Sequence, residues 1–222
     1  MLPAILAAAP FGLLVGALAT AKGLSPLEAI LMSALVFAGS AQFVALDLWT
    51  EPVSWVVIGL TTLLVNFRHV LMGASLAGRL PTTTTGGRGV AAFLMADETW
   101  AMAELKARQG GLTVAYYAGL GVTLYLNWIL WTGVGAVAGA AIDDPARYGF
   151  DFAFTAIFIG LIAGLWRGSD TTWVVAASAA AAVAANVVAD GPWFILAGAI
   201  AGVAAAALLA NGNGGQATEG EP

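Results

Sequence analysis

The sequence predicts an all-α polytopic integral membrane protein, and two observations carry that prediction. First, 60% of the 222 residues are hydrophobic and only 9% are charged, whereas ordinary soluble domains have about 25% charged residues. Second, the apolar residues come in runs about 20 residues long, the length of helix that crosses about 30 Å of hydrocarbon. A water-soluble fold of this size could not bury so much apolar surface.

Eight apolar segments follow one another along the chain, separated by short stretches with Gly, Pro and charged residues that end helices. They span residues 2–21, 27–49, 53–78, 90–106, 112–141, 150–166, 171–189 and 192–210. No Lys or Arg precedes Lys22, so the first segment is expected to be a span rather than a signal peptide. We expect residues 1–210 to form a single transmembrane domain and residues 211–222, which lack large apolar side chains, to form a disordered polar C-terminal tail.

The fourth segment, residues 90–106, is short and contains Asp97, Glu98 and Glu104. If all eight segments cross with the N-terminus outside, the loop Lys and Arg residues divide without bias. If the fourth segment instead enters and returns, only Arg147 lies outside, and the inner loops hold Lys22, Arg79, Arg88, Lys106, Arg108 and Arg167. The second arrangement obeys the positive-inside rule. We therefore expect about seven transmembrane helices plus one short re-entrant or broken helix, with the N-terminus outside; eight full spans is the alternative.

The third segment carries the motif N-F-R-H-V at residues 66–70, which contains the single histidine of the chain. At 100° per residue, Asn66, Arg68 and His69 fall on one half of a continuous helix and the large apolar residues on the other. An arginine at membrane depth costs roughly 2.5–3.5 kcal/mol, so it needs a carboxylate, backbone carbonyls or a substrate anion. The motif indicates a polar site, with snorkelling of Arg68 to the inner surface as the alternative.

Two further stretches could complete such a site. Asp97 and Glu98 are adjacent carboxylates on a short helix, and they suit pairing with Arg68, proton transfer or binding of an ammonium group, unless they lie in the headgroup region. F-A-G-S-A-Q-F at residues 37–43 places a flexible polar stretch in the middle of the second segment. Many transporters build their midplane sites from such broken helices.

Glycine pairs four residues apart indicate close helix packing rather than chemistry. The pairs are Gly12/Gly16, Gly135/Gly139 and Gly160/Gly164.

Composition also excludes several functions. The absence of cysteine excludes disulfides, zinc thiolates and cysteine nucleophiles. We expect no cofactor or metal. The net charge of -5 argues against a surface that binds nucleic acid. The stretch G-A-S-L at residues 73–76 superficially resembles a serine hydrolase motif. However, His69 and Ser75 would lie about 9 Å apart along one helix, beyond a Ser–His hydrogen bond. We expect no enzyme activity.

The motifs taken together resemble the AzlC family of branched-chain amino-acid permeases and exporters. The similar stretches are P-F-G-L-L-V-G, F-A-G-S-A-Q-F, N-F-R-H-V-L-M, A-D-E-T-W-A, Y-Y-A-G-L-G-V-T-L-Y-L-N-W and G-F-D-F-A-F-T-A-I-F, over about residues 9–165. The resemblance implies a multi-pass protein of the bacterial inner membrane that works with a small AzlD-type membrane subunit. It also implies that Arg68 and His69 pair with the acidic D-E-T segment.

The resulting hypothesis is a transporter that exports branched-chain or other small hydrophobic L-amino acids: valine, leucine and isoleucine, with methionine as a further candidate. The sequence contains no phosphate-binding P-loop, so the proton gradient is the expected energy source. The alternative is a passive channel, or a carrier of the same fold for a different small solute. The expected substrate-binding residues are Asn66, Arg68, His69, Ser40, Gln42, Phe43 and Trp100, and the expected proton-coupling residues are Asp97, Glu98 and His69.

Overall fold

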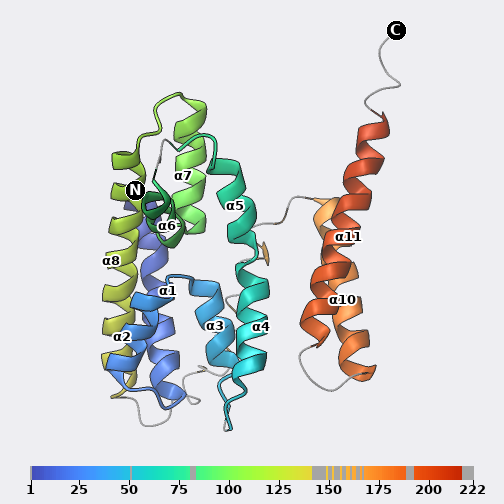
Figure 1. Cartoon of the computed structure of the whole chain (residues 1–222). Coiled ribbons are helices and arrows are strands. Elements are labelled where there is room, and N and C mark those ends of the chain that lie inside the picture. Colours follow the sequence, from blue (N-terminus) through green and yellow to red (C-terminus); the bar gives the residue numbers. More distant parts are fainter. Residues whose placement is uncertain are drawn as a thin grey trace. The chain divides into compact units, whose positions relative to one another are not determined.

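The computed structural model describes residues 2–50, 52–80, 84–141, 168–188 and 193–216, together with isolated positions between 149 and 166. All regular structure among these residues is helical, which confirms the predicted all-α class (Figure 1). The chain divides into two compact units, residues 1–154 and 155–222, and each is described by itself.

The first unit contains three long apolar segments and two pairs of short helices. The long segments are α1 (Leu2–Ala21), the consecutive helices α4 (Trp55–Asn66) and α5 (Arg68–Leu76), and α8 (Val114–Gly139). The short pairs are α2 (Pro26–Leu35) with α3 (Gly39–Asp47), and α6 (Thr85–Phe93) with α7 (Asp97–Arg108).

Helices α1 and α8 pack closely because glycines from both line their contact. A Cβ added at Gly16 would overlap the backbone of Thr132, and one at Gly135 would overlap the backbone of Leu13. The pairs Gly12/Gly16 and Gly135/Gly139 therefore serve packing, as predicted. The two helices run in the same direction, since Ile5 lies by Asn127 at one end and Ala17 by Gly139 at the other. Pro10 does not interrupt α1.

The second apolar segment, expected to be one full span, is instead a hairpin of two short helices. The Gln42 side chain donates a hydrogen bond to Ser33 Oγ over 2.8 Å, although nine residues of continuous helix would separate the two positions by about 13.5 Å. The chain breaks at residues 36–38, directly before the Gly-Ser pair that begins α3, and α3 returns toward the end of the unit at which α2 begins (Figure 1). The expected polar break is present, but the chain reverses there.

The third segment is also interrupted, at Phe67, where the structure differs from a continuous helix. The Phe67 N–H bonds to Leu64 O and the Val70 N–H to Phe67 O, both with the tighter spacing of three residues. Such a turn within a helix often marks a functional position. The predicted apolar face is nevertheless exposed, as lipid contact requires, and it consists of Leu60, Leu63, Phe67, Val70 and Leu71.

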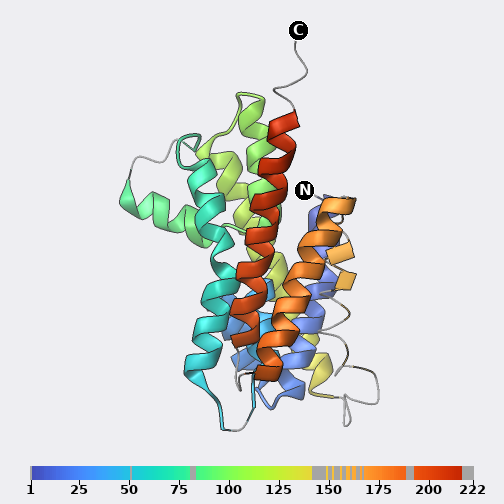
Figure 2. The same cartoon turned by 90° about the vertical axis from the view of Figure 1, so that its right-hand side faces the viewer.

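The fourth segment forms a second hairpin, with its turn at residues 94–96. Helix α7 runs in the same direction as α5, because Arg68 meets Asp97 near one end and Arg79 meets Glu104 at the other. Figure 2 shows α6, in green, lying across the long axis of α4 and α5. The fourth segment is therefore a hairpin and not one straight helix, which is the form a re-entrant segment takes.

The two hairpins change the expected orientation of the chain. Helix α7 runs opposite to α8, since Lys106 lies over the Tyr116 ring and Leu94 lies by Gly121. Because α1 runs parallel to α8, the start of α1 lies on the same side as the α7–α8 turn. The expectation that placed the N-terminus opposite to this basic side is therefore wrong, and the reason is that the second segment folds back instead of crossing.

The second unit contains α10 (Ser169–Val188) and α11 (Trp193–Gln216), which form an antiparallel helix pair. Ser178 Oγ donates to Gly198 O over 2.9 Å, where the small residue allows close approach. Helix α11 continues past the expected end at Ala210, and the rest of the expected tail, residues 217–222, lies outside the described residues. The sixth expected segment, residues 150–166 with Gly164, is described only at isolated positions.

Five stretches among the described residues are long and apolar enough to cross a membrane. They are Ala4–Ala21, Trp55–Leu76, Val114–Gly139, Ser169–Val188 and Trp193–Ala210. The chain is thus a polytopic membrane protein, as predicted.

The glycine contact between α1 and α8 gives a first testable prediction. Gly135→Ala should lower the midpoint of thermal unfolding in detergent, because overpacking costs typically about 1–3 kcal/mol. The control is Gly119→Ala on the same helix, where an added Cβ meets nothing within 4 Å. Equal midpoints for the two variants would contradict the packing described.

The hairpin form of the second segment gives another prediction, which the cysteine-free chain makes simple to test. Single cysteines at Lys22 and Pro52 should react with an impermeant maleimide from one side of the membrane. Cysteines at Gly86 and Gln109 should react from the other side. Labelling of positions 22 and 52 from opposite sides would mean that residues 27–49 form a full span.

Candidate functional site

The tips of the two hairpins meet at the interrupted third segment, around Arg68. Arg68 is the first residue of α5, directly after the turn at Phe67. Its Nη2 donates to Ser40 Oγ over 2.6 Å, and its Nη1 pairs with Asp97 Oδ2 over 2.6 Å. Ser40 and Asp97 belong to the first turns of α3 and α7. Residues far apart in the sequence, all of them predicted for the site, are therefore brought together by one guanidinium.

Helices α3 and α7 therefore both begin beside Arg68. No side chain caps either of these helix starts, whereas Ser25, Thr84 and Thr113 cap α2, α6 and α8. Unsatisfied N–H groups and the helix dipole favour an anion at such a position. Together with the Arg68 charge, the place suits a carboxylate.

Several polar atoms in this neighbourhood are buried without a hydrogen-bond partner among the described residues. They are Asn66 Oδ1 and Arg68 Nε, on either side of the Phe67 turn, and Thr99 Oγ1 in the first turns of α7. Leaving a buried donor or acceptor unpaired costs about 1–3 kcal/mol. Because Arg68 Nε is a donor and Asn66 Oδ1 is an acceptor, one small solute carrying both an anionic and a cationic group could satisfy both.

The other titratable residues predicted for the site, His69 and Glu98, do not pair with Arg68. His69 Nδ1 lies 3.1 Å from Asn66 O, so it contacts its own turn rather than the acidic segment. Glu98 follows Asp97 and is exposed. The predicted pairing with the D-E-T segment is thus present for Arg68, through Asp97. The described residues contain no group of three or more His, Asp or Glu side chains that could hold a metal ion.

Two predicted residues, Gln42 and Phe43, are buried behind the site instead of lining it. Gln42 donates to Ser33 Oγ and accepts from Trp128 Nε1, both over 2.8 Å. Ser33 Oγ in turn donates to Thr132 Oγ1 over 3.0 Å. This buried network holds the α2/α3 hairpin against α8, so Gln42 positions Ser40 rather than facing a solute.

The predicted residue Trp100 lies one turn beyond Asp97 and faces α5. Its Nε1 donates to Ser75 Oγ over 2.7 Å, and its ring packs against a core of α5, α7 and α8 residues.

Sequence reasoning missed several residues that support the site. Ser33, Trp128 and Thr132 make the buried network, Thr99 is buried beside the acidic pair, and Tyr125 touches both hairpins. The Tyr125 ring contacts Phe37 and Phe93 edge to face, and its hydroxyl donates to Ala34 O. The Y-L-N-W motif contained Tyr125 and Trp128, but only the fold shows what they contact.

A family model described as "AzlC protein" matches residues 3–142. The chain belongs to the AzlC family. The matched region ends just after α8, so it contains both hairpins and all residues around Arg68.

Among curated AzlC relatives, the chain is 27% identical to "Inner membrane protein YgaZ" of Escherichia coli over 94% of this chain and 87% of that protein. It is 26% identical to "Branched-chain amino acid transport protein AzlC" of Bacillus subtilis, over 83% of this chain and 72% of that protein. It is also 26% identical to an "Uncharacterized membrane protein" of Archaeoglobus fulgidus, over 81% of this chain and 78% of that protein. No solved structure matches this chain significantly.

The buried network gives a prediction for stability. Trp128→Phe should lower the free energy of unfolding by about 1–3 kcal/mol, because it leaves Gln42 Oε1 buried and unpaired. The matched control is Trp131→Phe, whose Nε1 bonds to the partly buried Asn127 on the same helix and should matter less. Thermal unfolding of the two purified variants checks this, and a larger loss for Trp131→Phe would contradict it.

Proposed function

We propose that this AzlC-family chain transports branched-chain or other small hydrophobic L-amino acids across the bacterial inner membrane. The convergence of Arg68 with the uncapped starts of α3 and α7, in a chain that is otherwise apolar, supports this proposal most directly. The names of the E. coli and B. subtilis relatives agree with an inner-membrane, branched-chain amino-acid transport role. On this reading the protein is a transporter and not an enzyme.

The substrate carboxylate binds at Arg68 Nε, beside the uncapped starts of α3 and α7. Its ammonium group donates to Asn66 Oδ1 and lies near the Asp97 carboxylate. In the substrate-free site, the charges of Arg68 and Asp97 neutralise each other. A zwitterionic substrate therefore adds no net charge to the site. A solute with a single charge would leave one of the buried groups unpaired.

The rest of the chain is assigned accordingly. Residues 1–210 form one transporter domain, and residues 211–222 form a polar tail. With the start of α1 on the side of Arg79, Arg88, Lys106 and Arg108, the positive-inside rule places the N-terminus in the cytoplasm. The α6/α7 hairpin then enters from the cytoplasmic side and the α2/α3 hairpin from the outer side. A small AzlD-type subunit and the proton gradient complete the transport system, which works as an exporter.

The deciding experiment is export of preloaded labelled valine and leucine from cells that lack their own exporters. The chain is expressed with and without a small AzlD-type protein, and efflux is measured with and without a proton uncoupler. Efflux that requires both proteins and collapses with the uncoupler supports a two-subunit, proton-driven exporter. Efflux that is insensitive to the uncoupler and does not saturate would indicate a passive channel, and absence of efflux would remove the substrate assignment.

A variant series tests the role of Arg68. Arg68→Ala should reduce valine transport by about 10- to 150-fold, the equivalent of a charged hydrogen bond worth about 1.5–3 kcal/mol. The amount of protein in the membrane should not fall. Arg88→Ala removes the same charge from an exposed position on α6 and should transport normally. Transport by Arg68→Ala near the wild-type level would exclude Arg68 from the site.

A further inference from the structure

The two hairpins are attached to their neighbours by contacts of different kinds. The α2/α3 hairpin is fixed to α8 by the network of Ser33, Gln42, Trp128 and Thr132, all of which are buried. The α6/α7 hairpin shares a buried apolar core with α5 and α8, but its polar contacts with the α5 side are only partly buried. A buried, fully bonded network resists opening, whereas a contact near water opens more easily. The α6/α7 hairpin is therefore the one suited to move.

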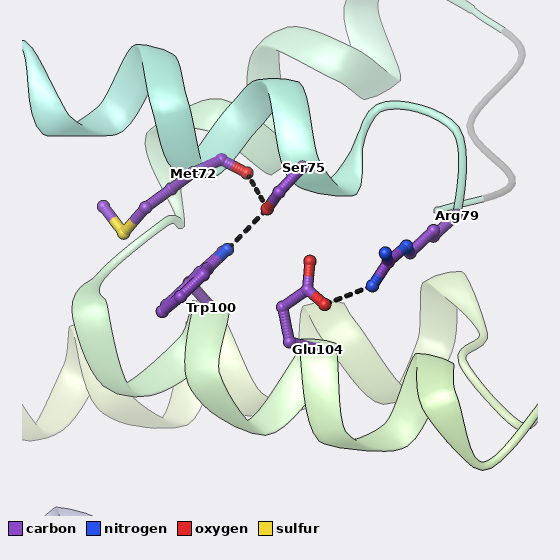
Figure 3. Close-up of polar contacts among 5 residues, drawn as sticks. All are labelled: Met72, Ser75, Arg79, Trp100 and Glu104. Atoms are coloured by element: carbon purple, nitrogen blue, oxygen red, sulfur yellow. Dashed lines mark hydrogen bonds and ion pairs between the residues drawn. The ribbon is translucent and has the colours of Figure 1, made fainter. Parts of the chain in front are cut away.

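Figure 3 shows the contacts between α5 and α7. Trp100 Nε1 donates to Ser75 Oγ over 2.7 Å, and Ser75 Oγ donates to Met72 O over 2.8 Å. Four residues further along both segments, Arg79 Nη1 pairs with Glu104 Oε2. Arg79 follows Ser75 by four residues, in the turn after α5, and Glu104 follows Trp100 by four residues on α7, so the two contacts are successive. We call the second contact the Arg79–Glu104 latch.

Glu104 stands in an unusual environment for a carboxylate. Its side chain is only 10% exposed, and Oε1 is buried without a partner among the described residues. Arg79, which holds the other oxygen, is 48% exposed. A buried carboxylate depends strongly on its partner charge. A proton that reaches this carboxylate removes the charge that holds Arg79.

The other charged and titratable groups of the adjoining elements are occupied elsewhere. On the α5 side, Arg68 pairs with Asp97, and His69 contacts Asn66 O. On α8, the Tyr117 hydroxyl donates to Ala91 O, the Tyr125 hydroxyl donates to Ala34 O, and Lys106 of α7 lies over the Tyr116 ring. Arg88 of α6 is exposed, as are Glu98 and Arg108 of α7. Among the described residues, Arg79 is thus the charged group that pairs with Glu104.

We propose that Glu104 is a proton-binding residue of transport, and that its protonation opens the latch and releases the α6/α7 hairpin from α5. A proton from the aqueous phase adds to the carboxylate and gives the neutral acid. Arg79 keeps its charge and turns to water, and no covalent bond changes. This inference rests on the proposed function, in which the hairpin tip carrying Asp97 closes one side of the Arg68 site.

A buried alanine on α7 reports the opening. Ala103 is fully buried in the core that also contains Met72, Leu76 and Tyr117. In the purified, otherwise cysteine-free protein, Ala103→Cys should be protected from maleimide at about pH 8. Its rate should rise up to about tenfold per pH unit as the pH falls, as one linked proton requires. Rates are taken relative to Gln109→Cys, an exposed position directly after the end of α7, which corrects for ionisation of the thiol itself.

Two controls make the labelling specific. Ala41→Cys lies equally buried in the α2/α3 hairpin and should stay protected at every pH. Adding Glu104→Gln to Ala103→Cys should make labelling fast and independent of pH, whereas adding Arg79→Lys, which keeps the cation, should preserve the pH dependence. A flat profile for Ala103→Cys alone, or an unchanged slope with Glu104→Gln, overturns the proposal. The pH profile of Ala103→Cys needs no change at Glu104, so it tests the proposal even if Glu104→Gln does not fold.

Transport separates failure of this inference from failure of the proposed function. In proteoliposomes containing the AzlD-type subunit, Glu104→Gln should retain exchange of labelled valine but lose accumulation driven by a pH gradient. Accumulation by Glu104→Gln at the wild-type level would overturn the role of Glu104 while leaving amino-acid transport intact. If the wild-type protein moves no valine at all, the proposed function fails, and the labelling profile still tests the latch.

Discussion

The positive charge of Arg68 at membrane depth is the constraint on which the rest of the structure depends. A guanidinium in hydrocarbon is tolerated only where protein or water replaces its hydration. Here the replacement comes from two directions, Ser40 from one hairpin and Asp97 from the other. Each hairpin must reach the interrupted third segment with a helix start, and that requirement explains why both break where they do.

Non-helical backbone at membrane depth must be buried in protein or line a wet cavity. The long helices α1 and α8 supply that protein, because their glycines bring the two backbones together and leave α8 as a wall for both hairpins. Tyr125 on this wall touches the tip of each hairpin. The site therefore depends on the packing of both hairpin tips against the α1/α8 pair.

The two hairpins share a form but differ in how firmly they are held. Gln42 and Trp128 secure one with bonds that water does not reach, while Ser75, Arg79, Trp100 and Glu104 secure the other near the surface. A carrier needs one firm side against which another side moves. This asymmetry, rather than the site itself, indicates where a proton could act.

The sequence alone determined the membrane class, the apolar face of the third segment, the packing role of the glycine pairs on α1 and α8 and the need of Arg68 for a partner such as Asp97. Composition, helical period and the cost of buried charge are local properties. Only the tertiary structure decided that residues 27–49 fold back, since a broken helix can continue or reverse and the choice depends on what it meets. The same contacts moved Gln42 from the expected site into a supporting network and placed the start of α1 on the basic side. They also joined Glu104 to Arg79, because a pairing between two helices depends on their relative position, which no local pattern records.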